Sequence, residues 1–309
     1  MRIALFDPWS GISGNMVLGA ILDARLPVGD LEALLRRLPL KGWSLEVSRV
    51  KRGGLSGTLV EVLVPRERTH RHLGEIRGMI RSAGLPRRVE DLSIAAFEAL
   101  AGAEARVHSC AVEEVHFHET GAMDAILDIV GSFAGMHLLG VEEAWSSPVA
   151  TGWGTVTCAH GELPVPAPAT AVLLEGAVIR RGRSRAELAT PTGAAILTTL
   201  VRDWSSPHPE CSVTGVGMGA GSMELEEAPN LLRMILGETR PAAGWSRDEC
   251  VEIVSLVDDM DPRLWPPLQK ALLAAGAMDC YTLSGTGRKG RPALELTVLC
   301  PPEAEQRVL

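Results

Sequence analysis

The spacing of apolar and polar positions predicts alternating strands and helices over the first 240 residues. An apolar run at 2–7 indicates a buried strand, a turn rich in serine and glycine follows at 10–14, and a helix is predicted at 15–24. Further helices are predicted at 30–37, 72–83, 86–105 and after Thr190, and further strands at 43–50, 56–65, 141–149, 212–216 and 231–236. This order predicts an α/β (α+β) first domain over residues 1–240.

The pattern changes after a linker at 238–247, which contains Pro241 and Gly244. A strand at 249–257, a helix at 262–275 and strands at 279–283 and 293–299 give the order β-α-β-β. That order is the first part of a ferredoxin-like β-α-β-β-α-β unit. We therefore expect a second, C-terminally truncated ferredoxin-like α+β domain over 248–309. We also expect the chain to be a fragment or one half of a split protein.

One segment joins possible metal ligands to a buried helix. The residues His116, His118 and Glu119 occupy an extended stretch, and an almost wholly apolar helix follows, which carries Asp124 and Asp128 on one face. Carboxylates on a buried helix need a cation or hydrogen-bond partners. A lone histidine pair is more often structural, but five possible ligands within thirteen residues favour a metal site. Imidazole and carboxylate suit Ni, Zn, Fe or Mn, and the sequence does not choose between these metals.

Three further histidines lie in contexts that leave their role open or favour function only slightly. His70 and His72 precede a helix, where they either join the metal site or form a solvated helix entry. His160 precedes a proline-stiffened loop at 164–168, which suits a precisely placed metal ligand as well as a tight connection. We add His160 to the metal ligand candidates.

The turn after the first strand is a candidate phosphate cradle. Ser10, Gly11, Ser13 and Gly14 lead into the first helix, whose backbone N–H groups suit an anion. The turn lacks the lysine of a P-loop and the complete G-x-G-x-x-G spacing, so the motif is weak by itself. Thr190 precedes a proline and forms either a helix cap, which is the safer interpretation, or a second anion site.

One further pattern in the first domain indicates a close contact between backbones. Glycines alternate with other residues over 215–221, which indicates that a backbone approaches closely there, although an ordinary strand and turn would also fit.

In the second domain, Asp258 and Asp259 end a strand, and Lys289 and Arg291 lie in a later glycine-containing turn. Acidic groups that hold Mg or Mn, with basic groups that hold phosphates, favour a nucleoside triphosphate site over a helix cap and a solvated turn.

Composition narrows the class of protein. The 309 residues carry a net charge of −8 and are 46% hydrophobic, which predicts a globular protein and argues against a general nucleic-acid binder. No apolar run approaches the roughly 20 residues needed to span a membrane, and we expect no signal peptide. The six cysteines are scattered without a C-x-x-C pair, which is typical of the reducing cytoplasm.

Seven stretches run in order from residue 6 to residue 292: FDPWSGISGNM, EVHFHETGAMDAILDIVG, GTVTCAHGELPVPAPAT, ATPTGAA, APNLLRMILG, VDDMDP and RKGRP. Together they resemble the LarC family of nickel insertion proteins, which complete the nickel-pincer nucleotide cofactor of lactate racemase. The resemblance covers nearly the whole chain, and HFHETGAMD and AHGELPVPAPAT are its most specific parts. Asn15 departs from the pattern, since the family usually has Asp there.

The resemblance implies an enzyme, a nickel insertase of the cyclometallase or chelatase type. Such an enzyme inserts Ni²⁺ into pyridinium-3,5-bisthiocarboxylic acid mononucleotide, and it requires CTP with Mn²⁺ or Mg²⁺. Glu119 or His118 is the implied base for the ring proton that leaves when the Ni–C bond forms. The implied site of CTP and its metal includes Asp258, Asp259 and Lys289. A homo-oligomer, or a separate C-terminal chain, is the expected assembly.

Two other functions fit the same residues. A divalent-metal-dependent phosphohydrolase would use the same histidine and aspartate ligands and would release phosphate without nickel transfer. A nickel storage or delivery protein would bind nickel tightly, whether or not CTP and the pincer precursor are present.

Overall fold

The computed structural model describes residues 1–65, 71–117, 122–158, 161–201, 204, 208–239, 249–257, 260–287, 290 and 292–309, without the side chains of His116 and Cys158. The chain divides into two compact units, Met1–Pro241 and Ala242–Leu309. Each unit is described by itself.

The first unit is built on a mixed six-stranded sheet. Its strand order is β2-β3-β11-β12-β1-β6. The strands are β1 (Arg2–Asp7), β2 (Ser44–Arg52), β3 (Leu55–Leu63), β6 (Glu143–Ser146), β11 (Cys211–Ala220) and β12 (Leu231–Thr239). Strand β1 runs antiparallel to β12 and parallel to β6, while β3 and β11 are parallel. The sheet is therefore mixed, as the α/β pattern allows.

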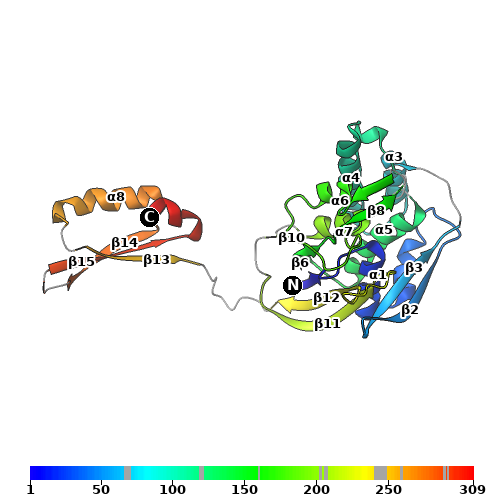
Figure 1. Cartoon of the computed structure of the whole chain (residues 1–309), viewed down its shortest axis with the longest axis horizontal. Helices are drawn as coiled ribbons and strands as arrows, with labels where there is room; N and C mark the ends of the chain where they lie inside the picture. The colour runs from blue at the N-terminus through cyan, green and yellow to red at the C-terminus, as the bar shows by residue number, and fades with distance from the viewer. Residues whose placement is uncertain are drawn as a thin grey trace. The chain divides into compact units, whose positions relative to one another are not determined.

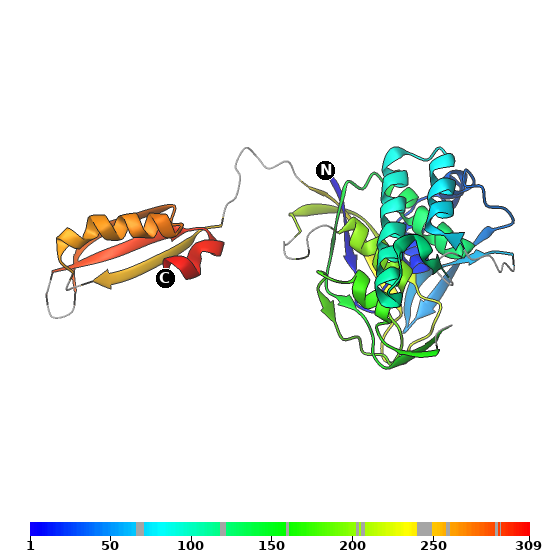
Figure 2. The same ribbon diagram turned by 90° about the horizontal axis from the view of Figure 1, so that it is seen from above.

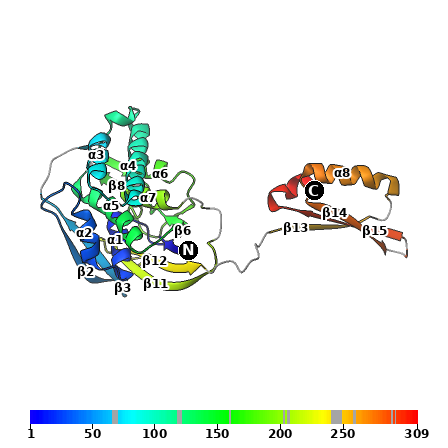
Figure 3. The same ribbon diagram turned by 180° about the vertical axis from the view of Figure 1, so that it is seen from behind.

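Helices cover one face of this sheet, as the opposite views in Figure 1 and Figure 3 show for α1 and α5. The helices of this unit are α1 (Gly14–Asp23), α2 (Val28–Leu35), α3 (Leu73–Ser82), α4 (Arg87–His108), α5 (Met123–Leu138), α6 (Pro168–Leu173) and α7 (Pro191–Leu200), with a 3₁₀ turn η1 (Val112–Glu114). Helix α5 is buried along most of its length, as its nearly continuous apolar sequence predicts. Figure 2 shows α3 and α4 side by side in cyan and teal.

Short strand pairs complete the first unit. They are β4 (Arg71–His72) with β5 (His116–Phe117), β7 (Val149–Ala150) with β10 (Ile179–Arg180), and β8 (Thr155–Cys158) with β9 (Gly161–Pro164). The sequence pattern did not predict the β8–β9 hairpin, because four-residue strands with mixed polarity give too little periodicity.

The alternating glycines of β11 receive helix α1. A Cβ on Gly217 would lie 1.9 Å from the backbone oxygen of Ala20, and a Cβ on Gly219 would lie 1.8 Å from that of Met16. The backbone of α1 therefore rests directly on the strand, with no side chain between them. This is the close backbone approach that the glycine spacing indicates.

The second unit has the element order β-α-β-β. A three-stranded antiparallel sheet of order β13-β15-β14 lies beneath helix α8, as Figure 1 shows. The elements are β13 (Val251–Val257), η2 (Pro262–Leu264), α8 (Trp265–Ala275), β14 (Asp279–Thr286), β15 (Pro292–Cys300), η4 (Pro302–Ala304) and α9 (Glu305–Val308). A small core around Ala277, Cys280 and Val298 holds them together.

These elements match the predicted positions of the larger strands and helices, so the mixed α/β class is confirmed. The assignment of 1–240 and 248–309 as functional domains stays a prediction, and most of the predicted linker lies outside the described residues. Among the described helices, none combines the length and the hydropathy needed to cross a membrane.

Candidate functional site

The predicted phosphate turn is held between β1 and helix α7. The Ile12 N–H donates to the Leu188 carbonyl at 2.8 Å, and the Thr190 N–H donates to the Ile12 carbonyl at 3.0 Å. Gly11 has φ of +99°, and a Cβ there would lie 2.0 Å from the Leu188 oxygen, so only glycine fits. The turn is thus a fixed connection that leads into α1.

Helix α7 begins beside this turn. The Thr190 side chain accepts a hydrogen bond from the Gly193 N–H at 3.2 Å, so Thr190 is the N-cap of the helix. Of the two interpretations of Thr190, the structure supports the helix cap.

The start of α1 contacts a carboxylate on α5. A Cβ on Gly14 would lie 2.5 Å from Oδ2 of Asp128, so the first residue of α1 packs directly on that side chain. The Oδ1 of Asp128 is buried and has no hydrogen-bond partner among the residues that the structure describes. Burial, together with the negative charge of Asp124, raises the pKa of Asp128 well above its usual range. A buried carboxylate in this state is suited to bind a cation, which would compensate its charge.

Asp124 lies one turn earlier on α5 and is exposed. It affects the titration of Asp128 through its charge, as expected for two carboxylates four residues apart on a helix. The structure therefore brings the predicted phosphate turn, at Gly14, against the predicted metal ligand Asp128, a contact that the sequence did not predict.

Strand β5 is anchored to helix α4 by Phe117. The Phe117 ring is buried and meets Phe97 edge to face, with 6.2 Å between ring centroids and 69° between planes. Its antiparallel partner β4 places His72 directly opposite His116 in the register. The His72 N–H also donates to Oε2 of Glu75 at 2.9 Å. His72, whose role the sequence left open, therefore lies at the segment that carries the predicted ligands.

The remaining predicted site residues lie outside the described residues. They are His118, Glu119, His160, Asp258, Asp259, Lys289 and Arg291, together with the His116 side chain and His70. Their roles stay predictions. Within the described ranges, no three His, Cys, Asp or Glu side chains gather closely enough to hold a metal ion.

The two ends of the turn face different surroundings. Ser13 Oγ donates to Asn15 Oδ1 at 2.5 Å, and Asn15 Nδ2 donates to Ser222 Oγ at 3.2 Å. Ser10, at the other end, lines a cavity with arginines of the segment 180–183. These arginines are not among the predicted site residues, although three arginines within four positions are a visible signal in the sequence.

Comparison with known proteins shows the family of the chain. The family model described as "Nickel insertion protein" matches residues 4–309. A protein of Desulfitobacterium hafniense (strain DSM 10664 / DCB-2), named "Pyridinium-3,5-bisthiocarboxylic acid mononucleotide nickel insertion protein", is 42% identical over 305 residues, which are 97% of this chain and 75% of that protein. A protein of the same name in Nocardioides sp. (strain ATCC BAA-499 / JS614) is 42% identical over 299 residues, which are 97% of this chain and 75% of that protein.

A relative in Geobacter sp. (strain M21) is 43% identical over 303 residues, which are 98% of this chain and 78% of the relative. No solved structure matches the chain. The family model and these identities define the class of protein, an enzyme that handles nickel. The chain belongs to the nickel insertion protein family.

Proposed function

We propose that this chain inserts Ni²⁺ into pyridinium-3,5-bisthiocarboxylic acid mononucleotide in a CTP-dependent reaction in the cytoplasm. The product is the nickel-pincer nucleotide. The observation that carries the proposal is the half-buried side chain of Asp128, whose buried Oδ1 has no hydrogen-bond partner in the described part of the chain. The printed names of two relatives, which specify this mononucleotide as the acceptor of nickel, support it.

Nickel is the substrate metal of the proposed reaction. Asp128 and Asp124, with His116, His118 and His160, hold Ni²⁺ before transfer. Nitrogen and oxygen ligands suit this holding role, because the two sulfurs of the acceptor are softer and can take the metal from them.

The transfer forms two Ni–S bonds and one Ni–C bond. When the ring carbon bonds to nickel, the electron pair of its C–H bond becomes the Ni–C bond and the proton leaves. Glu119 or His118 accepts that proton, because both directly precede the helix that carries the aspartates.

The second unit takes CTP. Asp258 and Asp259 hold Mn²⁺ or Mg²⁺, and Lys289 and Arg291 hold the phosphates of the nucleotide. This assignment follows the sequence pattern of acidic and basic groups at the ends of neighbouring strands.

Mass spectrometry of the small molecules tests the proposal. The 309-residue protein is mixed with the pincer precursor, Ni²⁺ and Mn²⁺, with and without CTP. We expect the nickel adduct only when CTP is present, and we expect Asp128→Asn to reduce its yield at least tenfold. Asp30→Asn is the matched control, because Asp30 is an exposed carboxylate in the first turn of α2.

Other products would contradict the proposal in distinguishable ways. Phosphate release without nickel transfer would identify a phosphohydrolase. Tight nickel binding that is unaffected by CTP and by the precursor, with no adduct, would identify a storage or delivery protein.

A further inference from the structure

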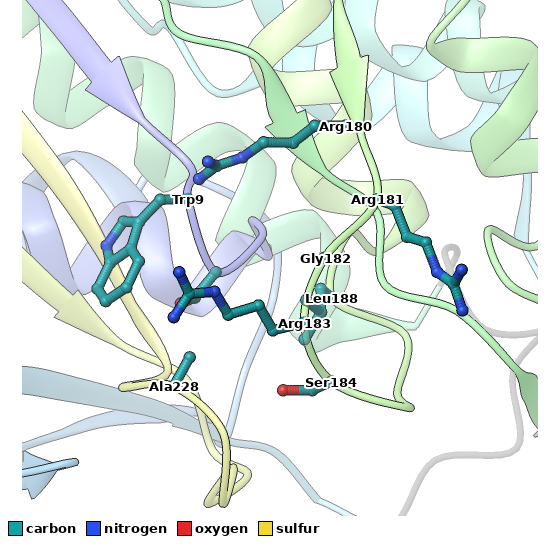
Figure 4. Close-up of a pocket in the computed structure, with 9 residues that line it drawn as sticks. Trp9, Arg180, Arg181, Gly182, Arg183, Ser184, Leu188 and Ala228 are labelled. Carbon is teal, nitrogen blue, oxygen red and sulfur yellow. The ribbon is translucent and has the colours of Figure 1, made fainter.

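A small cavity with strongly basic walls lies beside the turn after β1. It has a volume of about 120 Å³, and its lining includes Trp9, Ser10, Arg180, Arg183 and Ser184 (Figure 4). Whole small-molecule pockets measure roughly 300–1,000 Å³. The cavity therefore suits one functional group of a ligand rather than a whole nucleotide.

Two hydroxyl groups in the lining have no partner. Ser10 and Ser184 are each 2% exposed, and the buried Oγ atoms of both make no hydrogen bond to any described residue. A buried hydroxyl without a partner is unfavourable, because it has lost the hydrogen bonds that water makes to it in the unfolded chain. Two such groups at one cavity indicate that their partner is a ligand.

The charge of the cavity comes from two arginines. In Figure 4 the guanidinium groups of Arg180 and Arg183 extend toward Trp9, whereas that of Arg181 extends to the other side. No carboxylate among the described residues lies within ion-pair distance of Arg180 or Arg183. Arg181 instead stacks over the Trp153 ring, 4.9 Å from its centroid. Two positive charges thus remain available to an anion.

The backbone that carries these arginines is fixed. The Trp153 indole N–H donates to the Arg183 carbonyl at 3.2 Å. A Cβ on Gly182 would lie 2.9 Å from the Gly152 nitrogen and 2.4 Å from Cδ1 of Leu188, so the turn packs closely against the neighbouring segments. The site is therefore held in place before any ligand binds, which lowers the entropic cost of binding.

We infer that this cavity binds the phosphate group of a mononucleotide through Arg180, Arg183 and the hydroxyls of Ser10 and Ser184. A phosphate monoester carries three terminal oxygens, which suit two guanidinium forks and two hydroxyl donors together. Trp9 supplies an aromatic wall near the remainder of the ligand. The inference rests on the proposed function in one respect: the mononucleotide is taken to be the pyridinium acceptor of nickel.

Calorimetric titration of the 309-residue protein tests the site with three probes. Nicotinic acid mononucleotide is a pyridinium mononucleotide, its riboside lacks the phosphate, and CTP represents the other nucleotide of the reaction. We expect the mononucleotide to bind at least tenfold more tightly than the riboside. Arg180→Gln and Arg183→Gln should remove that preference, and Arg181→Gln, the matched control, should keep it.

A serine variant separates ligand binding from structure. Ser184→Ala should weaken mononucleotide binding about tenfold and leave the melting temperature of the free protein unchanged or higher, because the hydroxyl has no protein partner to lose. A lower melting temperature with unchanged binding would show a structural serine and overturn the inference.

The titrations also separate the other possible outcomes. If Arg183→Gln weakens the binding of CTP and leaves the binding of the mononucleotide unchanged, the cavity binds the triphosphate and the inference is wrong. If all three arginine variants keep the preference for the mononucleotide over the riboside, the cavity is not a phosphate site and the inference is wrong. If the phosphate preference is present but the nickel adduct never forms, the inference stands while the proposed function fails.

Discussion

At the scale of single residues, the carboxyl group of Asp128 has an environment that changes its titration. Its pKa is raised by burial and by the charge of Asp124. Between the usual carboxyl pKa and this raised value, the folded protein binds more protons than the unfolded chain. The free energy of unfolding of the metal-free protein therefore falls as pH rises through that window, and the loss persists above it.

The first prediction concerns the variant Asp128→Asn. Without the carboxylate charge, the metal-free variant should be more stable than the wild type at pH 7, because the wild type loses stability as pH rises through the raised pKa of Asp128 and the variant does not. Urea unfolding at pH 4.5 and pH 7 measures this difference. A variant less stable than the wild type at pH 7 would contradict the raised pKa, and Asp30→Asn should show no such gain.

The sequence predicted the positions of single residues correctly where their spacing along a helix alone determines the geometry. The common face of Asp124 and Asp128 follows from their four-residue separation on a helix, and the cap at Thr190 follows from its place before Pro191. The buried hydroxyl of Ser10 could not be predicted in this way. Ser10 shares its cavity with Arg183 and Ser184, which are more than 170 residues away in the sequence, and nothing local indicates that proximity.

At the scale of elements, the contact between α1 and β11 positions the turn that carries Ser10 and Gly14. The glycine spacing of β11 predicted a close backbone approach, and the structure confirms it. The identity of the approaching element was not predictable, because it depends on the order of strands in the sheet. Strand order is decided by long-range packing, which leaves no periodic signal in the sequence.

The second prediction compares two alanine substitutions on the same strand. Gly219→Ala places a Cβ 1.8 Å from the backbone oxygen of Met16, so α1 must move away from the sheet. We expect a loss of about 1–3 kcal/mol in unfolding free energy, as for an overpacked core, together with a lower yield of the nickel adduct. Denaturant unfolding and the mass-spectrometric assay measure the two effects.

Gly215→Ala is the control for this prediction. The nearest atom to a Cβ there is Cδ1 of Leu236 at 3.5 Å, an ordinary contact. Equal destabilisation by the two substitutions would mean that strand propensity, and not the contact with α1, determines the requirement for glycine.

At the scale of the whole molecule, the two units have separate hydrophobic cores. The main core and its small neighbour draw on residues of Met1–Pro241, and the core around Cys280 draws on residues of Ala242–Leu309. The order β-α-β-β of the second unit was predictable from its sequence, since each element has its own hydrophobic period. The strand order of the six-stranded sheet was not.

The third prediction follows from this separation. A protein that comprises only residues 1–241 should unfold in one cooperative transition and should keep the phosphate-dependent preference for nicotinic acid mononucleotide. Calorimetric melting and titration test the two parts. Loss of the cooperative transition would mean that the first unit needs the second to fold.

The turn between Ser10 and Gly14 has one more consequence, which follows from its length. Four peptide steps separate the residue that lines the arginine cavity from the residue that contacts Asp128. Even a fully extended chain spans only about 14 Å over four steps. The turn therefore limits the distance between the Cα atoms of Ser10 and Gly14, and we expect a ligand that reaches both the cavity and Asp128 to be short.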